Sequence, residues 1–115
     1  MAVRPVLAAF FVPVDPDRVL VLLADRLIEY NASTRATRVV KTAAEAGLGR
    51  LNQVAGARDG GVWLAAERGI GKLGRPPGSD EYSRWSVYRP GALGLAGFRD
   101  LFEGHDGEVF VVGLA

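Results

Sequence analysis

The fold is decided by the segment Asp59–Leu73, which reads DGGVWLAAERGIGKL. It begins with an Asp-Gly pair, which is typical of a hairpin turn because glycine tolerates a positive φ. A continuous apolar run follows at Val62–Ala66, and such a run indicates a strand that is covered on both faces. After a polar reversal, Gly69–Leu73 resembles a return strand. The segment therefore predicts a turn, a buried strand, a tight turn and a second antiparallel strand.

The same pattern occurs twice more in the chain. Residues Asp17–Tyr30 align with it without a gap at an offset of 43 residues, and Asp106–Gly113 aligns with it at an offset of 47 residues. One column of this alignment holds a large apolar residue in each copy, namely Leu20, Trp63 and Phe110. We expect these side chains to fill the gaps between neighbouring sheets. A period in the forties with one hairpin in each copy is typical of propeller blades.

Shorter apolar segments around these hairpins supply the remaining strands. Strands are predicted in the three copies at 7–12, 19–23, 27–30 and 37–41, then at 54–57, 62–66, 69–73 and 85–89, and finally at 101–103 and 109–112. The sequence thus predicts an all-β protein with one domain over residues 1–115, built of antiparallel β-propeller blades. About two and a half four-stranded repeats form an incomplete ring, with copies at about 7–46, 47–93 and a truncated 94–115.

Two local predictions concern the joints between strands. Two prolines and two aspartates predict that the first strand ends at Pro13 and that a turn covers 13–17. The segment Thr42–Gln53 has a composition that also suits a short helix. Because Gly47 and Gly49 each cost about 1 kcal/mol inside a helix, we instead expect a connector between blades there, with a counterpart at Gly94–Leu101.

Composition excludes several classes of function. The 14 Lys and Arg residues balance the 13 Asp and Glu residues, so the net charge gives no field that attracts nucleic acid or an anionic membrane. Without cysteine, the chain forms no disulfide, thiolate nucleophile or Cys-ligated zinc site. The longest apolar run, Val6–Val12, is far shorter than the roughly 20 residues that span a bilayer. Because Pro5 and Pro13 bracket it and no clear cleavage site follows, we interpret it as a strand and not as a signal peptide.

The motifs resemble the two-component regulator propeller repeat. Its pattern is Gly-Leu, an apolar strand, Asp-Gly or Asp-x-Gly, an apolar-Trp-apolar strand and a closing Gly-Leu. The segments that carry the resemblance are Gly47-Leu48, Val54, Asp59–Leu64 and Glu67–Ile70, and in the third copy Gly94-Leu95, Leu101, Asp106-Gly107 and Val109–Gly113. The resemblance covers most of the chain. The first copy departs from it, because Asp17-Arg18 and Asp25-Arg26 stand where glycines are expected.

This resemblance implies a sensing module. In that family, many blades form large propellers in the periplasmic or extracellular sensor region of hybrid histidine kinases, and sometimes of diguanylate cyclases. The propellers detect ligands such as glycans. The resemblance therefore implies a non-catalytic module for ligand sensing or interaction in signal transduction, in the periplasm or outside the cell. No cofactor is predicted. Its expected partners are a small molecule or glycan, the remaining propeller blades of a longer chain, or copies of itself. An orphan structural fragment is the plainer alternative.

A second resemblance offers an enzymatic alternative. Val62–Leu64 followed by Gly69–Leu73 is also similar to the streptogramin lyase repeat, and lyases of that kind use a His base and a divalent metal. The chain has one histidine, His105, on the turn before the third copy's strand. A single histidine on a turn, here flanked by Gly104 and Asp106, is more often a solvated turn residue than a general base. Metal catalysis also needs several converging ligands, which the spacing of His and carboxylates does not supply.

Three residues are the candidates for ligand binding. Arg50 and Asn52 lie in the expected connector between blades, near the central channel where propellers often bind ligands. Trp85, at the start of an expected outer strand, can stack on a sugar ring. The simpler explanation for Arg50 and Asn52 is that they belong to a turn and that their polar groups are hydrogen-bonded within the chain. No catalytic residue and no metal ligand is predicted.

Overall fold

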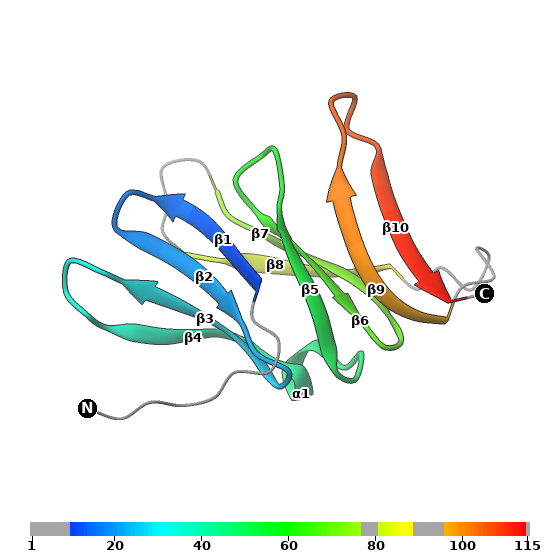
Figure 1. The fold of residues 1–115 in the computed structure, drawn as a ribbon, viewed down its shortest axis with the longest axis horizontal. Coiled ribbons are helices and arrows are strands. Elements are labelled where there is room, and N and C mark those ends of the chain that lie inside the picture. Colours follow the sequence, from blue (N-terminus) through cyan, green and yellow to red (C-terminus); the bar gives the residue numbers. More distant parts are fainter. Residues whose placement is uncertain (1–9, 77–80, 89–95, 115) are drawn as a thin grey trace.

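The computed structural model describes residues 10–76, 81–88 and 96–114, which form three antiparallel β-sheets arranged side by side (Figure 1). The first sheet has the strand order β1-β2-β3-β4, the second β5-β6-β7-β8, and the third pairs β9 with β10. The strands are β1 (Phe10–Asp15), β2 (Arg18–Leu22), β3 (Arg26–Asn31), β4 (Thr37–Thr42), β5 (Leu51–Gly56), β6 (Val62–Ala66), β7 (Gly69–Gly74), β8 (Ser83–Tyr88), β9 (Ala96–Glu103) and β10 (Val109–Leu114). The predicted antiparallel β architecture with four-stranded sheets is confirmed.

The end of β1 differs from the prediction. The strand does not stop at Pro13 but continues to Asp15, and the turn is correspondingly shorter. A β-bulge shifts the register between Pro13 and Asp15, and bulges are places where a strand tolerates proline. The Asp15 carboxylate then closes the turn by accepting hydrogen bonds from the backbone N–H groups of Asp17 and Arg18, both at 2.9 Å. The predicted strand residues 7–9 lie outside the described part of the chain.

A helix joins the first two sheets, and the prediction of a helix-free connector is therefore wrong. The helix α1 (Ala43–Ala46) is one turn long. It begins with a capping box, in which Glu45 N–H donates to Thr42 Oγ1 at 3.1 Å and Thr42 N–H donates to Glu45 Oε1 at 2.9 Å. Gly47 follows with a φ of 71°, the left-handed conformation that ends helices. The glycine penalty was thus applied to a residue that lies beyond the helix and not inside it.

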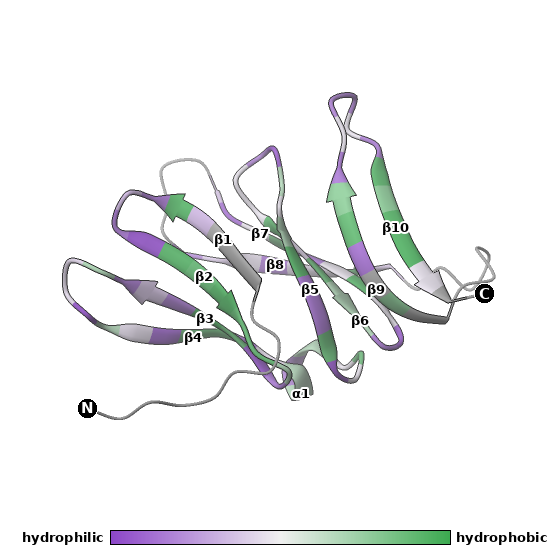
Figure 2. Ribbon diagram, viewed as in Figure 1, coloured by the Kyte–Doolittle hydropathy of each residue, from purple (hydrophilic) through white to green (hydrophobic). Residues whose placement is uncertain are grey.

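Apolar layers between the sheets form the core. The first layer lies between sheets one and two and contains Leu20, Leu22, Leu27, Ala46, Leu48, Leu51, Val54, Val62, Leu64 and Ala66. The second layer lies between the second sheet and the β9–β10 hairpin and contains Trp63, Ala65, Ile70, Phe98 and Leu101. All residues of β6 are buried, because alternate side chains enter the two layers. This confirms the prediction of a strand covered on both faces, and Figure 2 shows the hydrophobic stretches of β2 and β10 in the same view.

The aligned large apolar residues do not all share one environment. Leu20 and Trp63 are buried, with 1% and 8% of their surface exposed, as expected for side chains between sheets. Phe110 is 46% exposed and stacks on Phe102 with ring centroids 5.0 Å apart. The expectation that Phe110 fills a gap between sheets is therefore wrong for the described chain. The reason is its place on β10, at one end of the row of sheets (Figure 1).

The two Asp-Gly turns adopt the predicted conformation. Gly60 has a φ of 93° and Gly107 a φ of 80°, both in the region that favours glycine. At the first turn, the Asp59 carboxylate accepts hydrogen bonds from Gly61 N–H at 3.0 Å and from Lys72 Nζ at 2.6 Å. The side chain thus ties the β5–β6 turn to β7. No helix among the described residues has the length and hydropathy needed to cross a membrane.

Acid is expected to weaken this tie. The hydrogen bond from Lys72 lowers the pKa of Asp59 below its ordinary value, so the pair stabilises the folded state above the unfolded-state pKa. That stability is lost as the pH falls through the lowered folded-state pKa. Thermal melts between pH 7 and pH 2 should show a smaller acid-induced fall in Tm for Asp59→Asn than for the parent chain. Because the carboxylate is 60% exposed, the effect should stay below about 1 kcal/mol.

The control for this prediction is Lys72→Met, which removes the other partner. It should flatten the pH dependence by a similar amount, since the pKa of Asp59 then returns toward its ordinary value. An unchanged acid-induced fall in Tm in both variants would show that the pair contributes nothing to stability.

Candidate binding site

A polar group of side chains interrupts the apolar layer between the first and second sheets. We call it the Glu29 cluster, and it consists of Arg18, Glu29, Arg38, Arg75 and Tyr82. The first three lie on β2, β3 and β4, whereas Arg75 follows β7 and Tyr82 precedes β8. Glu29 pairs across the strands with Leu20 and with Arg38. It therefore lies on the face of the first sheet that packs against the second sheet.

Glu29 is a buried carboxylate with one unsatisfied oxygen. Its residue is 6% exposed, and its Oε1 accepts a hydrogen bond from Arg38 Nε at 3.1 Å. Its Oε2 is buried and has no hydrogen-bond partner among the described residues. A buried charged oxygen without a donor is costly, so nearly all such atoms in proteins are paired. Glu29 Oε2 is thus the point in the cluster where an additional donor gains the most.

Two guanidinium groups lie near the ring of Tyr82. The Arg38 and Arg75 Cζ atoms lie 6.0 and 5.8 Å from the centroid of its ring, at cation–π distance. Burial raises the pKa of Tyr82, so its phenol stays protonated at neutral pH and can donate a hydrogen bond. The ring is half-buried against the apolar layer between the sheets. Tyr82 therefore links Arg38 of the first sheet to Arg75 of the second sheet within the cluster.

The three arginines of the cluster differ in their ion pairs. Arg18 binds Asp15 through a contact of 2.6 Å, which lowers the pKa of that carboxyl. Arg38 is shared between Glu29 and Glu81, the second at 3.5 Å. Arg75 has no ion pair within the described residues. The cluster thus offers a carboxylate that needs a donor and a guanidinium that can take an anion.

The sequence-predicted residues Arg50, Asn52 and Trp85 do not come together in one site. Arg50 is exposed, and its backbone N–H and C=O pair with Glu67 at 2.7 and 3.0 Å, which docks the β6–β7 turn on the connector. Asn52 lies in β5 and not in the connector, because β5 begins at Leu51. Its Nδ2 donates to the Phe98 carbonyl at 2.7 Å and so links the second sheet to β9.

Trp85 lies between the first and second sheets. Its half-buried ring covers Gly71, and Lys41 Nζ lies 4.7 Å from the ring centroid. Asn52 and Trp85 therefore have contacts that hold neighbouring sheets together. Ligand binding by Arg50, Asn52 or Trp85 stays a prediction.

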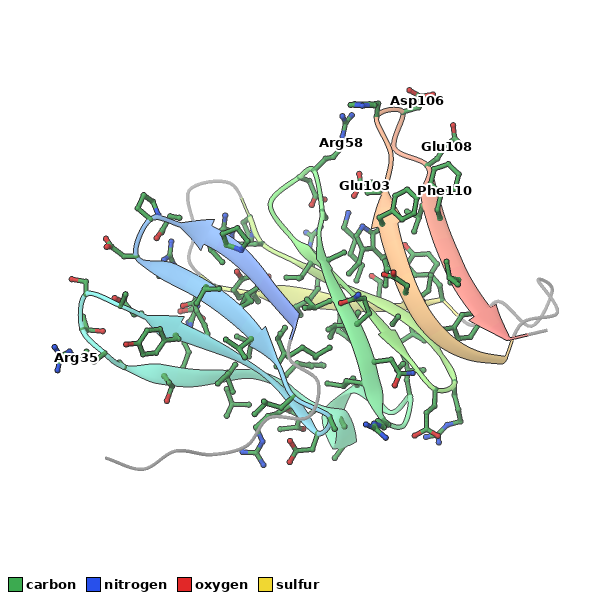
Figure 3. The ribbon with its side chains drawn as sticks, in the orientation of Figure 1. Arg35, Arg58, Glu103, Asp106, Glu108 and Phe110 are labelled. Carbon is green, nitrogen blue, oxygen red and sulfur yellow. The ribbon has the colours of Figure 1, made fainter. Side chains whose placement is uncertain are left out.

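The predicted lyase residue His105 lies at another junction, between the second sheet and the hairpin. Glu103 Oε2 accepts hydrogen bonds from Trp63 Nε1 at 2.9 Å and from Arg58 N–H at 3.2 Å. The Arg58 guanidinium contacts His105 through its carbonyl oxygen and, at 3.1 Å, through Nδ1. Figure 3 shows Arg58 at the β5–β6 turn beside the hairpin that carries Glu103. In the described ranges, no three His or carboxylate side chains are grouped to hold a metal.

Sequence reasoning missed the Glu29 cluster, although part of its signal was present. In β3, alternation places Leu27 and Glu29 on the same face, and Leu27 is 0% exposed. A carboxylate in register with a core leucine indicates a buried charge. The cluster members Arg75 and Tyr82 belong to the second copy, so their approach to the first sheet depends on how the two sheets stack.

The chain was also compared with known proteins. No protein-family model, curated protein or solved structure matches it. The similarities to the two-component regulator propeller and streptogramin lyase repeats therefore remain hypotheses. The candidate site rests on the chain's own residues and their geometry.

Proposed function

We propose that the chain is a non-catalytic binding module of propeller-type blades and that its ligand binds at the Glu29 cluster. Two four-stranded meanders and a hairpin place aligned residues in corresponding positions at offsets of 43 and 47 residues. Face-to-face stacking of such repeats is the principle of a propeller. If the resemblance to the two-component regulator propeller holds, this module is part of a sensor that detects a small molecule or glycan.

The observation that carries the proposal is the unsatisfied Oε2 of Glu29 in a cluster that also holds Arg75 without an ion pair among the described residues. Glu29 Oε2 is buried, so a side-chain rearrangement in the cluster must expose it before a ligand hydroxyl can donate to it. A ligand carboxylate can pair with Arg75. An acidic sugar carries both groups. We therefore propose an acidic oligosaccharide as the ligand, with the arginines supplying attraction and the buried carboxylate supplying specificity for hydroxyl groups.

Glu29→Gln is expected to weaken this binding at least tenfold. The amide preserves the shape of the side chain but removes the charge that makes its hydrogen bond strong, and hydrogen bonds to charged groups contribute about 1.5–3 kcal/mol. Isothermal titration with oligogalacturonate and with a neutral oligosaccharide of the same length measures the effect. Arg75→Gln should reduce the preference for the acidic probe.

Arg35→Gln is the matched control, because Arg35 lies at the exposed β3–β4 turn (Figure 3). It should bind the acidic probe like the parent chain. Circular dichroism and a thermal melt check that the Glu29 variant folds. Equal affinity in the parent and Glu29→Gln chains, or binding of neither oligosaccharide, would contradict the proposal.

A further inference from the structure

The outer face of the β9–β10 hairpin is apolar and uncovered. It carries Phe102, Phe110 and Val112, which are 54%, 46% and 53% exposed. Phe102 and Phe110 are cross-strand partners and Val112 lies two residues further along β10, so the three share one face. We call it the hairpin face. Exposed apolar groups of this kind mark interaction surfaces.

The earlier copies show what covers this face. Phe110 and Val112 align with Trp63 and Ala65, which are 8% and 0% exposed beneath the β9–β10 hairpin. They also align with Leu20 and Leu22, which are 1% and 2% exposed beneath the second sheet. In both buried instances the covering element is a β-sheet of this chain. In the third copy, where no described sheet lies beyond β10, the equivalent residues Phe110 and Val112 are exposed.

The residues that cover these side chains also occupy equivalent positions in the alignment of the copies. Against Leu20 and Leu22 the second sheet presents Val62 and Leu64, and against Trp63 the hairpin presents Val109 and Val111. The aligned residues of the first sheet are Val19 and Val21. Cross-strand pairing places them on one face, the outer face of the first sheet, which consists of Val19, Val21, Ile28, Tyr30 and Val39. Val39 is 50% exposed and the others are partly buried.

We infer that the hairpin face binds the outer face of the first sheet of a second copy of this chain. The two faces lie at opposite ends of the row of sheets, so they cannot meet within one molecule (Figure 1). Between copies they form a head-to-tail contact that continues the stacking already present twice. Such a contact grows until the rotation closes a ring. Two or three copies supply the roughly four to eight blades of a propeller.

The first test is the absolute mass of the full chain in solution. Light scattering behind a sizing column should give a discrete multiple of the 12.3 kDa chain mass. Phe110→Asp places a charge in the hairpin face and should give the mass of one chain. Val39→Asp blocks the opposite face and should do the same. Val87→Asp, at a 39% exposed valine outside both faces, is the matched control and should keep the parent mass.

Mixing the two blocked variants tests whether the contact is head-to-tail. Phe110→Asp retains a free first-sheet face and Val39→Asp retains a free hairpin face. Their equimolar mixture should therefore double in mass to a dimer that cannot grow. An isologous contact between two hairpin faces would leave Val39→Asp oligomeric and would overturn the inference. A parent chain that stays monomeric at every concentration would also overturn it, and circular dichroism confirms that each variant is folded.

Discussion

Trp63→Ala is expected to lower the free energy of unfolding by about 3–5 kcal/mol, the range for truncating a buried tryptophan. The side chain is 8% exposed and packs with Ala65, Ile70, Phe98 and Leu101 between the second sheet and the β9–β10 hairpin. Its Nε1 donates to Glu103 Oε2 at 2.9 Å. Lys72 Nζ lies 5.2 Å from its ring centroid. Truncation leaves a cavity and removes one of the hydrogen-bond donors to the half-buried carboxylate of Glu103.

Urea unfolding followed by circular dichroism measures this loss. Trp63→Phe separates its two parts, because phenylalanine retains most of the packing and removes the hydrogen bond to Glu103. That bond involves a charged acceptor, so we expect about 1.5–3 kcal/mol from its removal. Val87→Ala, at an exposed valine, is the reference and should stay within about 0.5 kcal/mol of the parent. A Trp63→Ala loss no larger than the Val87→Ala loss would show that the layer is not tightly packed.

Local sequence patterns predicted the strands and turns well. The run Val62–Ala66 coincides with β6, because a strand buried on both faces must be apolar throughout. The Asp-Gly turns were predictable for a similar reason, since the required positive φ restricts the residue type. In each case the deciding constraint lies within a few residues of the segment itself.

The helix α1 was missed because its capping signal was overlooked and the glycine penalty was applied to the whole segment 42–53. Thr42 and Glu45 have the spacing of a capping box, and Gly47 has the position of a helix end. Averaged over 42–53, the two glycines instead argue against any helix. A helix of one turn is stabilised by its caps and not by the propensity of its interior.

The candidate site was beyond local reasoning. Asn52 and its acceptor Phe98 are 46 residues apart, and their contact follows from how β5 approaches β9. Arg38, the hydrogen-bond partner of Glu29, comes from the neighbouring strand β4, whereas the cluster members Arg75 and Tyr82 lie just after β7 and just before β8. The period of the repeat predicts that the sheets stack. It does not predict which polar side chains meet where they stack.

Gly71→Ala is expected to destabilise the fold by about 3 kcal/mol, at the upper end of the range for overpacking a core. A Cβ atom at Gly71 would overlap the Cη2, Cζ2 and Cζ3 atoms of Trp85. The indole cannot shift freely, since it packs against the apolar layer between the first two sheets and Lys41 Nζ lies 4.7 Å from its ring centroid. Moving the ring outward therefore loses packing on the first sheet as well as relieving the overlap.

A double-mutant cycle with Trp85→Ala isolates the cause. With the indole removed, the added methyl group has space, and alanine is preferred to glycine inside a strand by roughly 0.5–1 kcal/mol. The same substitution should thus be harmful in the parent chain and neutral or stabilising in the Trp85→Ala background. The difference between the two backgrounds corresponds to a coupling of about 3–4 kcal/mol, at or just above the upper end of the range for residues in contact. Equal losses in both backgrounds, measured by urea unfolding, would mean that backbone strain and not Trp85 requires glycine at this position.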